Sequence, residues 1–398
     1  MSTSVEPNIR ELTKSEMEGL VNSMLAEMAR GLKEPNQPLR MLHSYVDHVP
    51  SGQEKGDFIT IDFGGSNMRV MHVQLKGNHE MSCSGHKWAI PEEKKRGCRP
   101  SDLFDWIAER VLEVQSKLSE VNFKPEIGFC FSFPLHQLTI KSAVLMQWNK
   151  GFDIPECIGK DVALLLDEAF ERAKSAFRVG ALVNDTVAVL LARSYESDDC
   201  QVGAVLGTGF NAAYWEVWEN VPKLAPDKYA STMKTIINTE IGGMPLRIDN
   251  QIDKIVDQQS NEPGKQMLEK RVSGMYLGLM FKAVNELDGI SLPSYSPKVM
   301  SLMEEEHLKG WERCEQISSR SCQYVACALA AIHARKNKAA FEVAMEGAVI
   351  ERYFKYKERL LTVLRADLGI SNISITVVDD YSAIGAAVAA SMDWNGDD

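Results

Sequence analysis

The stretch GDFITIDFGGSNMRVMHVQL, residues 56–75, decides the fold of this chain. It predicts two β-strands with alternating apolar residues, interrupted by Asp62 and the adjacent glycines Gly64 and Gly65. A second stretch, CQVGAVLGTGFNAAYWEVW at 200–218, repeats the pattern of apolar strand, glycine turn and alternating strand. Each hairpin opens its own half of the chain. The sequence therefore predicts an internal duplication, with two similar domains whose glycine turns face one another across a cleft.

Length and composition support a two-domain globular protein. At 398 residues the chain is too long for one compact core. Its 44% apolar and 25% charged residues are close to the average for globular proteins, so nearly the whole chain is expected to fold. A net charge of −11 argues against nucleic acid or an anionic membrane as the main partner.

Cysteine spacing and the absence of long apolar runs bear on location. The eight cysteines lack the close pairs of zinc or thioredoxin-like centres, and we interpret most of them as buried apolar residues. The start of the chain has no positive-then-apolar pattern, and no stretch approaches about 18 consecutive apolar residues. These features predict a cytoplasmic protein without membrane insertion. The sequence leaves open whether it forms a homo-oligomer.

Strand and helix patterns alternate along the chain. Apolar residues at helical spacing predict a first helix at 9–32. Strands are then predicted at 57–63, 68–75, 126–133 and 138–145, and helices at 160–175 and 186–196. Beyond about residue 262 the pattern is mainly helical, and it closes with a strand at 373–380 and a helix from Ser382. This alternation is typical of the α/β class.

The two glycine turns have the chemistry of a polyphosphate site. Glycine lets backbone N–H groups approach a ligand closely, and consecutive N–H groups form a nest for anions. Asp62 could accept from waters around a magnesium ion that travels with a nucleotide. Further donors are available beside the turns from Ser66, Asn67, Arg69, Thr208 and Asn211. The alternative is that both turns are ordinary hairpin connections.

Two other motif interpretations fail on their context. DFG at 62–64 matches the magnesium motif of protein kinases, but no HRD loop precedes it. GTGFNA at 207–212 matches the dinucleotide-binding pattern, which must open a helix, whereas the residues that follow it alternate like a strand.

A third candidate element is ALVNDTVAVLL at 181–191. A buried strand here delivers Asn184 and Asp185 to the start of a helix. Asp185 could cap the helix, or it could orient a hydroxyl nucleophile and accept its proton. Ser132 and Lys150 also lie in apolar surroundings; the alternatives for them are a structural hydroxyl and a surface cation.

Taken in order, these motifs resemble the hexokinase family, which includes the glucokinases. The resemblance covers most of the chain and rests on EMARGL, GQEKGDFITIDFGGSNMRV, FSFP, WNKGF, LVNDTVA, LGTGFNAAY, INTEIGG, EPGKQMLEKRVSGMYLG and ISSRSCQYVACALAAI. It implies a two-domain actin-like ATPase (ribonuclease H-like) fold with an interdomain cleft that closes over ATP and a hexose. It also implies that residues 1–50 are an N-terminal helix and lead-in packed on the large domain, 51–184 the small domain, 185–382 the large domain, and 383–398 a helix returning to the small domain.

The resemblance assigns roles to individual residues. Asp185 would be the base for the sugar 6-hydroxyl, and Lys150 would help to neutralise charge during phosphoryl transfer. The sugar would be bound by Asp185 and Lys150 together with Ser132, Phe133, Asn149, Asn184, Asn211, Glu240, Gln266 and Glu269. ATP would lie on Asp62, Gly64, Gly65, Ser66, Asn67, Arg69, Gly207, Thr208, Gly209 and Ser382. Asp62 would hold Mg²⁺ through water.

Departures from the family pattern fall mainly on the nucleotide side. Tyr381, Ala383 and Ile384 replace Gly, Gly and Lys of the adenosine loop, and EGA at 346–348 replaces an Asp-Gly-Ser/Thr phosphate contact. Because side chains now occupy positions where backbone would approach adenosine, we expect the nucleotide to bind differently or more weakly.

The expected function is ATP-dependent phosphorylation of a hexose at the 6-hydroxyl, with glucose the first candidate. The alternatives are a catalytically weak homologue that acts as a sugar sensor or regulator, and a kinase with another acceptor, an N-acetylhexosamine, or another phosphoryl donor.

Overall fold

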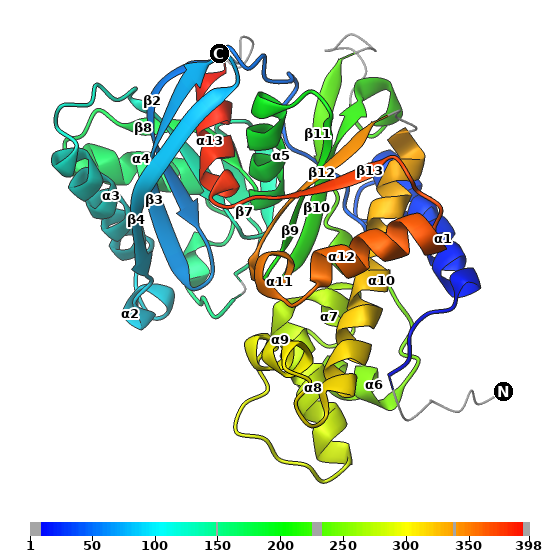
Figure 1. The fold of residues 1–398 in the computed structure, drawn as a ribbon. Helices are drawn as coiled ribbons and strands as arrows, with labels where there is room; N and C mark the ends of the chain where they lie inside the picture. Colours follow the sequence, from blue (N-terminus) through cyan, green and yellow to red (C-terminus); the bar gives the residue numbers. More distant parts are fainter. Residues whose placement is uncertain (1–8, 149, 225–232, 337–339, 393–398) are drawn as a thin grey trace.

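The computed structural model describes residues 9–148, 150–224, 233–336 and 340–392, which form two lobes side by side (Figure 1). Each lobe is built on one main β-sheet. Two helices, α5 (Asp185–Glu196) and α13 (Tyr381–Ser391), lie between the sheets. The expected two-domain α/β architecture is therefore confirmed.

The small lobe is built on a five-stranded sheet with the order β4–β3–β2–β5–β8. β2, β3 and β4 form an antiparallel meander, and β5 and β8 continue the sheet parallel to β2. The register places Asp62 opposite Arg69 on one side and Cys130 on the other. The strands are β2 (Lys55–Phe63), β3 (Asn67–Gly77), β4 (Glu80–Ala89), β5 (Glu126–Phe131) and β8 (Arg178–Val183), with a separate hairpin of β6 (Leu135–Thr139) and β7 (Ser142–Leu145).

The large lobe is built on a six-stranded sheet with the order β1–β11–β10–β9–β12–β13. Its strands are β1 (Leu42–His43), β9 (Cys200–Leu206), β10 (Phe210–Val217), β11 (Lys234–Asn238), β12 (Phe341–Glu346) and β13 (Ile373–Val377). β9, β10 and β11 form an antiparallel meander, and β12 and β13 run parallel to β9. Apart from β1, this repeats the topology of the small lobe strand by strand, which confirms the predicted duplication.

Helices cover both faces of the small-lobe sheet because its strands alternate. Ile127 and Phe129 of β5 face the core with α3 (Pro100–Lys117) and α4 (Val162–Arg172), whereas Cys130 faces α5 and α13. The other helices are α1 (Lys14–Lys33), α2 (Glu92–Lys95), α6 (Gln251–Gln259), α7 (Glu269–Val272), α8 (Gly274–Leu287), α9 (Pro297–Glu305), α10 (Trp311–Lys336), α11 (Ala348–Arg352) and α12 (Tyr356–Thr362). Shorter turns are η1 (Pro155–Cys157), η2 (Trp218–Asn220), η4 (Ile241–Gly243) and the π-helical η5 (Val363–Asp367).

Within the described residues, no helix is both long and apolar enough to cross a membrane.

The helices α5 and α13 cross in close contact. A Cβ at Gly385 of α13 would lie 1.8 Å from the carbonyl oxygen of Ala188 in α5, so only glycine fits. Gly203 of β9 gives α5 similarly close access to the large-lobe sheet, and Gly128 of β5 gives α13 access to the small-lobe sheet. Each helix thus follows one sheet in the sequence and packs on the other.

Three sequence-based expectations need correction. The first helix begins at Lys14 rather than near residue 9, because Thr13 and Glu16 form a capping box there. Residues 138–145 are not one strand but parts of the β6–β7 hairpin. The mainly helical region beyond 262 contains the central strand β12, whose six residues are too short to give a periodic signal.

A buried ion cluster in the large lobe has one carboxylate for two guanidinium groups. Arg320 donates to both oxygens of Asp253, at 3.1 and 2.8 Å, and Arg271 Nε lies 3.1 Å from the same carboxylate. Arg271 and Asp253 have no exposed side-chain surface, and Nε and Nη1 of Arg271 make no hydrogen bond. Burial lowers the pKa of Arg271. The second arginine therefore adds an uncompensated buried charge.

We expect Arg271→Met to raise the free energy of unfolding by about 1 to 4 kcal/mol, because an apolar side chain of similar length removes this charge and its unsatisfied donors. Asp253→Asn, which leaves both arginines without a counter-charge, should instead lower it by about 3 to 5 kcal/mol. Denaturant unfolding at neutral pH measures both changes. A less stable Arg271→Met protein would contradict this account of the cluster.

Candidate active site

The two glycine hairpins belong to different lobes, the first joining β2 to β3 and the second joining β9 to β10. The β2–β3 turn is closed by Gly64 N–H donating to Asn67 O at 3.1 Å, and the β9–β10 turn by Gly207 N–H donating to Gly209 O at 3.0 Å. Gly347, which follows β12, lies directly behind the second turn, where a Cβ would come within 2.6 Å of Leu206 backbone. Its φ of 123° suits glycine. The residue before it, Glu346, connects this turn to the other lobe.

Arg69 joins the two lobes through carboxylates. From β3 it donates to Asp62 Oδ2 at 2.8 Å in its own sheet. It also donates to Glu346 at 3.0 Å and Asp380 at 2.5 Å, and Asp379 Oδ1 lies 3.9 Å from it. Burial acts to lower the pKa of Arg69, but the carboxylates of Asp62 and Glu346 together act more strongly and raise it. The guanidinium is therefore a fixed cation surrounded by four acidic groups.

Glu346 ties this ion cluster to the start of α13. Its Oε2 accepts from both the N–H and the hydroxyl of Ser382, at 2.9 and 2.7 Å, while Oε1 accepts from Arg69. Burial raises the pKa of Glu346 to about 7, with Arg69 opposing the shift. Ser382, expected on the nucleotide, is buried with both of its donors directed to Glu346.

The substituted adenosine loop forms the first turn of α13. Asp380 precedes the helix with φ 60°, and its carbonyl accepts from the N–H groups of Ala383 and Ile384. The side chains of Ala383 and Ile384 are buried in the core between the sheets, and the Tyr381 hydroxyl donates to Glu196 of α5. The side chains that replace the family's residues are therefore accommodated by packing of Ala383 and Ile384 and by the hydrogen bond of Tyr381.

Asp185 is the first residue of α5. Asn184 is the N-cap and accepts from Thr186 N–H at 3.1 Å, and Asp185 Oδ1 accepts from the same N–H at 2.8 Å. Burial raises the pKa of Asp185, although the charge of Lys150 opposes the shift. Asn184 and Asp185 thus share the capping of α5. A carboxylate with a raised pKa beside a lysine suits a proton acceptor.

Lys150 and Ser132 approach Asp185 from the small lobe. Lys150 has φ 52°, and its Nζ donates to the carbonyl of Ser132 at 2.7 Å and lies 5.4 Å from the centre of the Phe133 ring. A Cβ at Gly65 would come within 2.6 Å of Lys150, so the first glycine turn packs directly on this lysine. Asn149, also expected on the sugar, lies outside the described residues.

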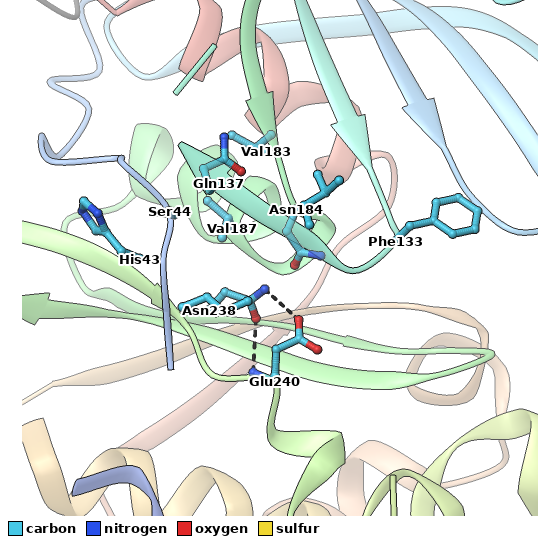
Figure 2. Close-up of a pocket in the computed structure, with 11 residues that line it drawn as sticks. His43, Ser44, Phe133, Gln137, Val183, Asn184, Val187, Asn238 and Glu240 are labelled. Carbon is cyan, nitrogen blue, oxygen red and sulfur yellow. Dashed lines mark hydrogen bonds between the residues drawn. The ribbon is translucent and has the colours of Figure 1, made fainter. Parts of the chain in front are cut away.

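Carboxylates and amides of the large lobe face these groups. Asn211 donates to Asn238 at 2.8 Å, and Asn238 donates to Glu240 at 2.8 Å. Figure 2 shows Asn184 directed toward Asn238 and Glu240 across a pocket. Burial raises the pKa of Glu240. The negative charge of nearby Asp185 adds to this rise, and the positive charge of Lys150 opposes it.

Glu269 and Gln266 adjoin the second glycine turn. Glu269 opens α7 and accepts from Phe210 N–H at 3.0 Å. Burial raises its pKa, against the charge of Lys150. Gln266 has φ 51° and lies beside Gly242, where a Cβ would come within 3.1 Å of its Oε1. Asp185, Glu240 and Glu269 are thus three half-buried carboxylates with raised pKa values, and in each the charge of Lys150 opposes the rise.

Comparison with known families agrees with this geometry. Two family models, both described as hexokinase, match residues 8–195 and residues 201–286 with 297–392. The chain belongs to the hexokinase family. Chloroplastic hexokinase-2 of Nicotiana tabacum is 31% identical over 98% of this chain and 90% of its own length. The glucokinase of Aspergillus niger is 31% identical over 94% of this chain and 93% of its own.

Solved structures confirm the hexokinase fold. The hexokinase of Schistosoma mansoni, solved in complex with glucose, has a TM-score of 0.84 at 28% identity, with 96% of each chain covered. The ROK hexokinase of Thermus thermophilus has a TM-score of 0.53 at 16% identity and covers 84% of this chain and 97% of its own; it shares the fold alone.

Four residues of this hexokinase-family site were missing from the sequence-based set. In the sequence, Glu346 stands out only as part of the substituted EGA at 346–348, and Asp380, Asn238 and Arg40 have no predicted role. Glu346, Asp380 and Asn238 each occupy or follow the carboxyl end of a large-lobe strand, where α/β folds usually place binding groups. That position is a signal the sequence contained. Arg40, whose charge lowers the pKa of Glu240, gave none.

The pKa of Glu346 predicts a pH dependence of stability. Its ordinary value of 4.5 holds in the unfolded chain, so between about 4.5 and 7 the folded chain binds the extra proton. This stabilisation is complete below 4.5 and is lost as pH rises through 7. From pH 5 to 8 we expect the wild type to lose about 2 to 3 kcal/mol more than Glu346→Gln in urea unfolding. Parallel profiles for the two proteins would contradict the raised pKa.

The two glycines of the β9–β10 turn differ in the space available for a side chain. A Cβ at Gly209 would lie 2.5 Å from Glu269 Oε2, whereas one at Gly207 meets nothing closer than 3.6 Å. We expect Gly209→Ala to displace Glu269 and weaken hexose binding at least about tenfold, because a charged hydrogen bond is worth about 1.5 to 3 kcal/mol. Gly207→Ala is the matched control and should stay within about threefold. Calorimetric titration with glucose tests this, and equal effects would remove Glu269 from the sugar site.

Proposed function

We propose that this chain transfers the terminal phosphoryl group of ATP to the 6-hydroxyl of a hexose, with glucose as the first candidate. It is thus a phosphotransferase of the hexokinase type. The observation that carries the proposal is the position of Asp185, a half-buried carboxylate at the first residue of α5 whose pKa is influenced by the charge of Lys150, a lysine on which the β2–β3 glycine turn packs. The glucose complex of the similar Schistosoma mansoni enzyme supports the choice of sugar.

In the proposed reaction the hexose hydroxyls are bound by carboxylate and amide side chains. Glu240 and Glu269 accept from ring hydroxyls, and the side chains of Asn184 and Asn211 bond others. Asp185 accepts the proton of the 6-hydroxyl as its oxygen attacks the phosphorus atom. The raised pKa values of Asp185, Glu240 and Glu269 follow from burial, and hydroxyl donors from the sugar would replace the lost hydration of these carboxylates.

The phosphates of ATP would lie on the N–H groups of both hairpins, with Thr208 and Asn67 adding side-chain donors and Lys150 near the transferred group. In-line positioning and neutralisation of the spreading charge supply most of the catalysis in such reactions. Closure of the lobes excludes water, which would otherwise take the phosphoryl group.

The chemistry of the donor set fits a magnesium ion that arrives with the nucleotide. Among the described residues no three His, Cys, Asp or Glu are grouped as direct metal ligands. Asp62 is a single half-buried carboxylate at the end of β2, which suits water-mediated contact, since Mg²⁺ keeps several waters. When bound, the ion would neutralise phosphate charge that the acidic surroundings of Arg69 would otherwise repel.

The proposal extends to the domain boundaries: 1–50 as helix and lead-in, 51–184 as the small domain, 185–382 as the large domain and 383–398 as the returning segment. The packing of α5 on β9 and of α13 on β5 supports the divisions at 185 and 383.

We expect Asp185→Ala to abolish phosphoryl transfer while hexose binding stays within about tenfold, because the lost carboxylate acts mainly on the moving proton. A coupled assay for ADP and calorimetric titration with glucose measure the two quantities. Asp198→Ala, which removes an exposed carboxylate beyond the end of α5, is the control and should keep full activity. Loss of binding by a folded Asp185→Ala protein would contradict the assigned role.

The same assay decides between the donors and acceptors. ATP, GTP and pyrophosphate are compared with glucose, fructose, mannose and N-acetylglucosamine, each with and without protein. Glucose-dependent turnover with ATP, at about 1 to 100 per second, supports the proposal. Sugar binding without turnover on any donor would make the chain a sensor instead.

A further inference from the structure

Lys223 is a half-buried lysine whose ammonium group makes three hydrogen bonds to backbone carbonyls. Nζ donates to Gly31 O at 2.7 Å, Arg40 O at 2.8 Å and Met41 O at 2.6 Å. These use all three of its N–H donors. Burial lowers the pKa of Lys223 to about 8, and no carboxylate among the described residues forms an ion pair with it. A lysine held in this way binds backbone rather than a counter-charge.

The three carbonyls belong to two segments that Lys223 holds together. Gly31 lies in the last turn of α1, where carbonyl groups lack helical partners and attract cations. Arg40 and Met41 belong to the lead-in segment, residues 39–44, which enters β1. The lysine therefore fixes the lead-in segment to the end of α1.

The lead-in segment needs such an anchor because its backbone is strained. Met41 has φ 47° and Tyr45, just beyond the segment, has φ 59°. Left-handed conformations cost non-glycine residues about 1 kcal/mol or more each and persist only where surrounding contacts impose them. Besides Lys223, the segment is held by β1, in which Leu42 pairs with Asn238 and His43 with Ile237.

The same segment forms one wall of a pocket that three residues proposed for hexose binding, Phe133, Asn184 and Glu240, also line. Leu42, His43 and Ser44 line the pocket that Asn184 and Glu240 also line (Figure 2). Asn238, the pairing partner of Leu42, donates to Glu240. Movement of the lead-in segment would therefore reach Glu240 through one backbone pairing and one hydrogen bond.

Arg40 adds a charge to this wall. Its positive charge opposes the burial that raises the pKa of Glu240, and its Nη1 lies 3.4 Å from Met146 Sδ of the small lobe. The carbonyl of this residue is fixed by Lys223, and its side chain contacts Met146 of the small lobe.

We propose that Lys223 is a positioning residue for hexose binding, holding the lead-in segment so that β1 and Arg40 keep Glu240 ready for the sugar. This inference rests on the proposed hexose site. Lys223 touches neither Glu240 nor the pocket, so it acts on substrate affinity rather than on the chemical step.

The test compares Lys223→Met with Lys33→Met, which removes an exposed lysine from the last turn of α1. We expect Lys223→Met to raise both the glucose dissociation constant in calorimetry and the glucose KM about tenfold, with kcat and the ATP KM within about twofold. Lys33→Met should match the wild type. Lys223→Arg, which keeps a cation with several donors, should recover part of the affinity.

A double-mutant cycle separates positioning from general loosening of the lobe. Arg40→Ala should weaken glucose binding by itself, and the combination with Lys223→Met should be clearly less than additive, because both act through Glu240. The cycle can use Lys223→Arg if Lys223→Met does not fold. Unchanged glucose affinity in folded Lys223 variants, additive losses, or an equal fall in kcat would each overturn the inference. A wild-type protein that binds no hexose would instead refute the proposed function.

Discussion

The close crossing of α5 and α13 is the constraint on which the rest of the structure depends. Gly385 against Ala188 brings the two helix axes together, and the glycines at 128 and 203 let each helix settle onto a sheet. α5 begins at Asp185, and α13 begins at Tyr381, directly after Asp380, so the crossing fixes the distance between the candidate base and the ion cluster around Arg69. The side chains of both helices that matter for the proposed chemistry lie at their first turns, where side chains of Asn184, Asp185 and Glu346 accept from backbone N–H groups that lack a helical partner.

The charges of the cleft divide into two groups with different tasks. Asp185, Glu240 and Glu269 are half-buried carboxylates whose pKa values are raised by desolvation, against the charge of Lys150, and a polyhydroxyl ligand would restore the hydrogen bonds lost with their hydration. Around Arg69, Asp62, Glu346, Asp379 and Asp380 outnumber the single cation. The first group suits a neutral sugar. The second would repel a bare polyphosphate, which supports the proposal that the nucleotide arrives with a metal ion.

Much of the fold could be predicted because its signals are local. The hairpin at 56–75, its repeat at 200–218 and the Asn184–Asp185 helix start each follow from spacing over about ten to twenty residues. The sugar residues came from resemblance to a family rather than from periodicity. The strand β12 was not predicted because its six buried residues give no periodic pattern. The separation of β6 from β7 was not predicted because it depends on a short turn.

What the sequence could not supply are contacts between distant residues. Glu346 meets Arg69 across 277 positions, and Lys223 meets Arg40 across 183. The substituted adenosine loop was expected to make the nucleotide bind differently or more weakly, and the burial of its Ala383 and Ile384 side chains in the interlobe core is something that only the three-dimensional packing reveals. The same holds for Arg271, an ordinary helical residue in the sequence and an uncompensated cation in the fold.

The exchange of helices between the sheets also determines how the two lobes depend on each other. A single half, ending with the helix after its fifth strand, would carry a helix that packs on the sheet of the other half and would leave its own sheet bare on one face. Neither half therefore completes its own core, and dividing the chain after α5 would expose one apolar sheet face in each part.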